Sequence, residues 1–96
     1  MNKVFEALAH PIRRDILEML KSGSKSAGAI ADAFPVSKPT MSGHFARLKE
    51  AGLIQADQRG TTILYSLNLS TLEEVLLGFM SRIGTDGMER KQGNEP

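Results

Sequence analysis

One segment constrains the fold of this chain more than any other: VSKPTMSGHFARLKE, residues 36–50. Its apolar residues Met41, Phe45 and Leu48 recur at helical spacing, which predicts a helix with one buried stripe. A proline in the first turn costs such a helix nothing, because the N–H groups there have no partner within the helix. A glycine in the middle costs about 1 kcal/mol relative to alanine. The segment therefore predicts a helix that is held by packing on a core and whose polar face serves a purpose.

Three shorter helices are expected before this segment. Asn2 is a suitable cap for the first, and Pro11 opens the second at a position where proline is tolerated. His10, directly before that proline, is interpreted as a turn or cap residue. Ser26 caps a third, short helix, which Pro35 stops. The third helix and the helix that Ser37 caps then form a pair of the helix-turn-helix kind.

Two β runs and a last helix are expected after it. Residues 53–59 and 62–67 meet at a Gly60-Thr61 turn, which is typical of a hairpin. In the second run Ile63, Tyr65 and Leu67 alternate with Thr62, Leu64 and Ser66, which predicts a strand with one covered face. Ser70 or Thr71 is expected to cap the last helix. The order is four helices, a hairpin and a final helix. This predicts a mainly α, α+β winged helix-turn-helix fold, with about five helices and a two-stranded wing.

Composition supports a single domain of ordinary globular type. The 96 residues carry a formal net charge of +1 and no cysteine, which excludes disulfides and thiolate metal sites. No apolar run approaches the roughly 18 residues of a membrane span, and no signal-peptide core is present, so a cytoplasmic chain is expected. Residues 1–83 are predicted to form the domain, and the polar, glycine-rich residues 84–96 a disordered tail.

The polar face of the helix over residues 37–51 is predicted to read DNA. In a helix-turn-helix the second helix enters the major groove with its N-terminal residues toward the bases. Gly43, in the middle of this face, would let the backbone approach DNA closely. Arg59, at the hairpin tip, is the expected probe of a flanking minor groove or of the backbone. The residues expected on the helix face are Lys38, Thr40, Ser42, Gly43, His44 and Arg47.

These features together resemble the ArsR/SmtB family of small bacterial winged-helix repressors. The resemblance rests on FEALAHPIRRDILEML, SAGAIADAF, VSKPTMSGHFARLKEAGLI and ILYSL, in that order over residues 5–67. It implies a homodimer, paired through its first and last helices, on an inverted repeat in a promoter. The implied dimer residues are Val4, Phe5, Leu8, Leu76, Phe79, Met80 and Ile83. The implied DNA contacts are Lys38, Pro39, Thr40, Ser42, Gly43 and His44, with Arg59 and Thr61 in the wing.

The family's metal-sensing motifs are not matched in this sequence. The last helix, residues 71–83, contains no histidine, and its acids are Glu73 and Glu74. The chain is most similar to the family branch that lacks an evident inducer site. No metal and no cofactor are therefore expected, and the release signal, whether a protein or a small molecule, is not specified by the residues.

Other interpretations remain open at this point. The low net charge favours, as an alternative, a winged-helix module that binds protein rather than DNA. An enzyme is not expected, because no phosphate-binding loop or nucleophile motif is present. Arg13 and Arg14 are expected either to touch phosphates or to remain at the surface, paired with acids such as Asp15 or Glu18 or solvated.

Overall fold

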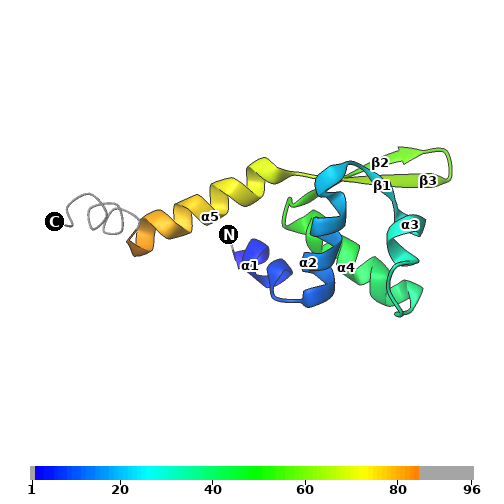
Figure 1. The fold of residues 1–96 in the computed structure, drawn as a ribbon, viewed down its shortest axis with the longest axis horizontal. Coiled ribbons are helices and arrows are strands. Elements are labelled where there is room, and N and C mark those ends of the chain that lie inside the picture. Colours follow the sequence, from blue (N-terminus) through cyan, green and yellow to red (C-terminus); the bar gives the residue numbers. More distant parts are fainter. Residues whose placement is uncertain (1, 85–96) are drawn as a thin grey trace.

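The computed structural model describes residues 2–84, and residues 85–96 of the predicted tail lie outside the described residues. The chain forms a winged helix-turn-helix, as the sequence predicts (Figure 1). The elements in chain order are α1 (Asn2–Leu8), α2 (Pro11–Met19), the 3₁₀ turn η1 (Leu20–Ser22), β1 (Lys25–Ser26), α3 (Ala27–Ala31), α4 (Lys38–Glu50), β2 (Ile54–Arg59), β3 (Thr62–Leu67) and α5 (Leu69–Ile83).

Three of the predicted helix starts are confirmed by side-chain caps. His10 Nδ1 accepts a hydrogen bond from the Ile12 N–H at 3.2 Å, and Ser26 Oγ accepts one from the Ala29 N–H at 3.1 Å. Ser37 does the same for α4. These caps depend on residues two or three positions apart, so the sequence alone identifies them.

Two helix ends differ from the predictions. Helix α3 stops at Ala31, and the chain turns before Pro35. The prediction that Ser70 or Thr71 caps the last helix is wrong: α5 already begins at Leu69, after Asn68, which makes no side-chain cap hydrogen bond. Only Asn68 separates the end of β3 from the start of α5, so the end of the strand determines where this helix begins.

A third strand, which the sequence analysis did not predict, joins the hairpin. Strand β1 pairs antiparallel with β3, with Lys25 opposite Tyr65, and the sheet order is β1-β3-β2. At two residues β1 is too short to show an alternating pattern. The predicted hairpin is confirmed, with Arg59 opposite Thr62 and Gly60 in the turn at a φ of 61°.

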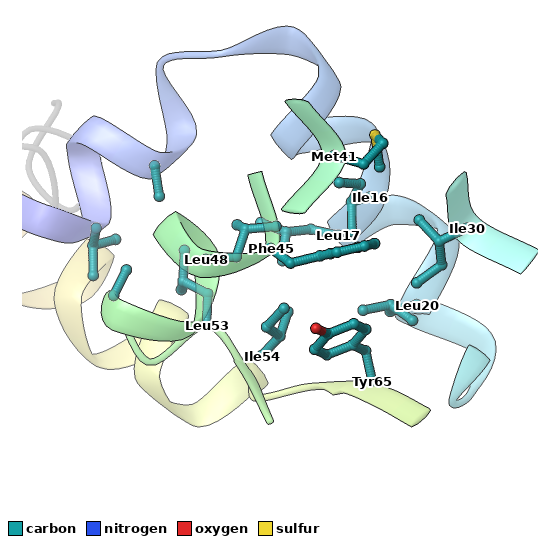
Figure 2. Packing of buried hydrophobic residues seen from close by; sticks show 13 residues of the cluster. Ile16, Leu17, Leu20, Ile30, Met41, Phe45, Leu48, Leu53, Ile54 and Tyr65 are labelled. Carbon is teal, nitrogen blue, oxygen red and sulfur yellow. The ribbon is translucent and has the colours of Figure 1, made fainter. Parts of the chain in front are cut away.

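The core lies between α2, α4 and the sheet (Figure 2). Ile16 of α2 and Leu48 of α4 are fully buried, and Leu53 is buried directly before β2. The rings of Phe45 and Tyr65 stack with their centroids 4.5 Å apart, which ties α4 to β3. This packing holds α4 in place despite the glycine in its middle.

Arg13 and Arg14 have a different role from either of those expected. Arg13 Nε donates to the carbonyl oxygen of Ala7 at 2.9 Å, and its Nη2 donates to that of Glu6 at 3.2 Å. Arg14 Nη1 donates to the carbonyl oxygen of Leu8 at 2.7 Å. The last carbonyls of a helix have no partner within it, so the two guanidinium groups complete the end of α1 and join it to α2.

Helix α5 extends past α1 and away from the sheet and the helix-turn-helix (Figure 1). Leu72 and Val75, in its first half, are half-buried against the core, and no residue of the helix is fully buried. Among the described residues, no helix is long and apolar enough to cross a membrane. Helix α5 therefore leaves a large apolar surface open.

Candidate nucleic-acid interface

Helices α3 and α4 form the helix-turn-helix, and α4 presents one face to solvent. Met41, Phe45 and Leu48 point into the core, as their spacing predicts. Around the rest of α4, the predicted contact residues with exposed side chains or an exposed backbone are Lys38, Pro39, Thr40, Ser42, Gly43 and Arg47. These six residues are called the α4 face below. They lie together on the first three turns of one helix.

The N-terminal end of the α4 face is fixed by its cap. Ser37 Oγ accepts a hydrogen bond from the Thr40 N–H at 3.2 Å and lies 3.0 Å from Thr40 Oγ1, to which it donates. The hydroxyl of Thr40 then keeps its own hydrogen to donate elsewhere. The unpaired N–H groups of the first turn add partial positive charge at this end. The end of α4 that carries Lys38 therefore favours an anionic or hydrogen-bond-accepting partner.

His44 does not belong to the α4 face, and the expectation that it does is wrong. Its side chain is only 7% exposed. At 100° per residue it lies about 40° round the helix from Leu48, next to the buried stripe. The ring of His10 packs on it with a centroid separation of 4.5 Å. His44 thus connects α4 with the start of α2 rather than reaching toward a ligand.

Burial also changes the acid–base behaviour of His44. Its Nε2 atom is buried without a hydrogen-bond partner. Desolvation, and then the nearby His10 and Arg13, lower the pKa of His44 below the ordinary value of 6.5. Protons consequently bind the unfolded chain more readily than the folded one. The contribution of neutral His44 to stability is present above about pH 6.5 and is lost as the pH falls toward its folded pKa.

We expect the stability of the protein to fall between about pH 7.5 and pH 5.5, partly because of His44. His44→Phe keeps a ring in the site but does not titrate, so its urea midpoint is expected to change less over this range. Urea unfolding at matched protein concentrations measures both midpoints. Equal pH dependence in the two proteins would contradict the assignment.

Arg47 lies farther along the α4 face and has an acidic neighbour. Its Nη1 is 3.6 Å from Glu50 Oε1, and both side chains are more than half exposed. A solvent-exposed pair of this kind contributes little to stability and breaks readily. The guanidinium of Arg47 is therefore available to another anion.

The tip of the hairpin has internal contacts that orient its arginine. Arg59 Nε and Nη2 both lie 2.9 Å from Asp57 Oδ2, and Gln58 Nε2 donates to the Gly60 carbonyl at 3.0 Å. Thr61 is exposed in the turn. Asp57 was not predicted from the sequence as the partner of Arg59. The i, i+2 spacing of the two residues, which places both side chains on one face of β2, could have indicated the pair.

The apolar surface of α1 and α5 includes most of the residues assigned to pairing. The Phe5 and Phe79 rings meet edge to face with centroids 5.2 Å apart. Leu8 is half-buried, and Leu76, Phe79, Met80 and Ile83 are between 36% and 68% exposed. Val4 is only 3% exposed, so its assignment to the surface is wrong. It faces inward from α1 and belongs to the hydrophobic core of the domain.

Two cavities adjoin α4. One, of about 340 Å³, lies between α1, α2 and α4 and is lined by the charged residues Lys3, Glu6, Arg13, Arg47 and Glu50. The other, of about 230 Å³, is mostly apolar and lies between α3 and α4, with Lys38 among its lining residues. Within residues 2–84, no group of three or more His, Cys, Asp or Glu side chains is placed to hold a metal ion.

Comparison with known proteins agrees with this geometry. A family model described as a helix-turn-helix domain matches residues 8–55, which include α2, α3 and α4. The transcriptional repressor SdpR of Bacillus subtilis is 42% identical over 89 residues, covering 90% of this chain and 99% of that protein. The repressor SmtB of Mycobacterium tuberculosis is 29% identical over 86 residues, covering 90% of this chain and 64% of that protein.

The fold is shared with solved structures as well. An ArsR-like transcriptional regulator from Rhodococcus sp. RHA1 superposes with a TM-score of 0.79 at 28% sequence identity. The match covers 98% of this chain and 85% of the other. The match thus includes both the helix-turn-helix and the long last helix.

Proposed function

This chain belongs to the ArsR/SmtB family of winged helix-turn-helix transcriptional repressors, and we propose that it acts as a homodimer on an inverted-repeat operator. The observation that carries the proposal is the α4 face, exposed on a helix whose opposite side is locked into the core. The match to SdpR over nearly its whole length supports the same role. The function is regulation in the cytoplasm rather than catalysis.

The shape of the molecule suits contact with two neighbouring grooves of DNA. Helix α4 would lie in the major groove, with Lys38 and Arg47 toward phosphates or guanine and the hydroxyls of Thr40 and Ser42 toward base edges. Thr61 and Arg59 at the hairpin tip would lie on the flanking minor groove or backbone. Arg59 would exchange its exposed partner Asp57 for a phosphate, with which the guanidinium also forms charge-assisted hydrogen bonds.

Pairing of two copies would cover the apolar surface of α1 and α5. A row of large apolar side chains along one side of α5 is exposed in the protomer, and Phe5 extends it onto α1. Contiguous exposed apolar surface of this kind marks an association site in soluble proteins. A two-fold pair uses the same patch on both copies, which matches the two half-sites of an inverted repeat.

We expect Lys38→Ala and Arg59→Ala each to weaken operator binding by about tenfold or more, since each removes a charged contact to DNA. The operator is first obtained by selection from randomised duplexes of about 30 base pairs, and affinities are then measured by fluorescence anisotropy at two salt concentrations. Lys21→Ala is the matched control, because Lys21 is an exposed lysine outside the proposed surface. Unchanged affinity in both variants would rule out the proposed surface.

A protein-binding module is the second candidate function, favoured by the net charge of +1. The same selection separates the two functions. Enrichment of an inverted repeat that is bound much more tightly than scrambled DNA at both salt concentrations supports the repressor. Binding without enrichment that weakens steeply as salt rises would favour the module.

A further inference from the structure

The glycine in the middle of α4 is not required by the protein's own structure. Gly43 is exposed, and its φ is not among the positive glycine angles of the described chain. A Cβ built on Gly43 would meet no atom within 4 Å. Gly52 is a contrasting case, since its φ is 77° and a Cβ there would touch Thr71. Neither backbone conformation nor packing explains a residue at position 43 that weakens the helix.

The position of Gly43 on α4 provides an explanation that lies outside the protomer. Residues three and four positions apart are neighbours on a helix surface, so Gly43 lies beside Thr40 and Arg47. It therefore occupies the centre of the α4 face. A side chain at this point would be the first protein group to meet a surface that docks on α4.

The side chains around Gly43 are short where base edges would be read. His44 is buried, so the arm next to Gly43 toward the start of the helix is the hydroxyl of Thr40. Ser42 lies about 100° round the helix from Gly43, on the side that lines the cavity between α3 and α4. The long side chains of the α4 face, Lys38 and Arg47, lie near its two ends. Short hydroxyl arms reach base edges only if the helix backbone lies deep in the groove.

We propose that Gly43 determines specificity by setting how deeply α4 enters the major groove, which brings the hydroxyl of its neighbour Thr40 to the base edges. This inference rests on the proposed function and adds a residue-level account of it. Base contacts specify the sequence, whereas phosphate contacts only position the protein. Shallower docking would therefore reduce discrimination between sequences and leave the phosphate contacts largely in place.

The test uses the full-length protein with Gly43→Ala and Gly43→Leu, and Gly78→Ala as the matched control. Gly78 is an exposed glycine within α5 whose added Cβ would also meet nothing. Both alanine variants are expected to raise the Tm by about 4 °C. Gly43→Ala is expected to weaken operator binding about tenfold and Gly43→Leu about 100-fold, with affinity for scrambled duplex nearly unchanged. Gly78→Ala is expected to keep the wild-type affinity for the operator and for scrambled duplex.

The possible results separate this inference from the proposed function. A more stable Gly43→Ala protein that binds the operator as tightly as wild type would overturn the inference alone. An equal loss on operator and scrambled DNA would also overturn it, because depth would then not affect discrimination. Failure of the wild-type protein to prefer any duplex would overturn the proposed function, and the inference with it.

Discussion

Phe79→Asp is expected to separate the proposed dimer into protomers and to lower operator affinity by more than about 100-fold. Phe79 lies in the middle of the exposed apolar row of α5, and its ring touches that of Phe5. A carboxylate on both copies at a two-fold contact would be desolvated and would face a like charge. Since one copy holds one half-site, loss of pairing removes the gain from binding two half-sites at once.

Sedimentation velocity measures the pairing, and anisotropy with the selected operator measures the affinity. Leu77→Asp is the matched control, because Leu77 is 63% exposed on the same helix but lies off the row that contains Phe79. The control is expected to remain a dimer and to bind DNA as wild type does. A Phe79→Asp protein that stays dimeric would show that the two copies pair through another surface.

Leu48→Ala is expected to lower the free energy of unfolding by about 2 to 5 kcal/mol. Leu48 is 0% exposed, and it is one of the residues that hold α4 on the core. The truncation removes apolar contacts and leaves a cavity in a small domain whose whole stability is of the order of 5 to 15 kcal/mol. Helix α4 depends on this packing because Gly43 lowers the intrinsic helix propensity of its sequence.

Urea unfolding at a fixed concentration of the chain measures this loss, since the proposed dimerisation would make stability depend on concentration. Leu77→Ala is the matched control: the same truncation at a side chain that is 63% exposed and lies off the proposed pairing row is expected to cost less than about 1 kcal/mol. Similar losses in the two variants would show that docking of α4 on the core is not what stabilises the domain.

Local signals explain most of what could be predicted from the sequence. The caps at Ser26 and Ser37 act over three residues, and the stripe of Met41, Phe45 and Leu48 follows helix geometry. For this reason the order of elements and the orientation of α4 were predicted correctly. The residues of the α4 face are exposed as predicted, whereas His44 is buried, and their contact with DNA stays a prediction.

The errors arose where distant residues decide the outcome. His44 is at the edge of a stripe, and it is buried because His10, 34 positions earlier, packs on it. Val4 was assigned to a pairing surface because the family resemblance implies pairing through the first helix, but only the tertiary structure shows which side of α1 is covered by the chain itself. Strand β1 exists only because β3 offers an edge to pair with.

The hydrogen bonds that Arg13 and Arg14 donate to the end of α1 have a consequence for the operator. Three carbonyl oxygens of α1 are held by side chains of α2, so the helix on the pairing side is fastened to the body that carries α4. In the proposed dimer the distance between the two reading helices is then set by folding and not by a flexible joint. Binding by the proposed dimer would then depend on the spacing between the two half-sites of the operator as much as on their base sequence.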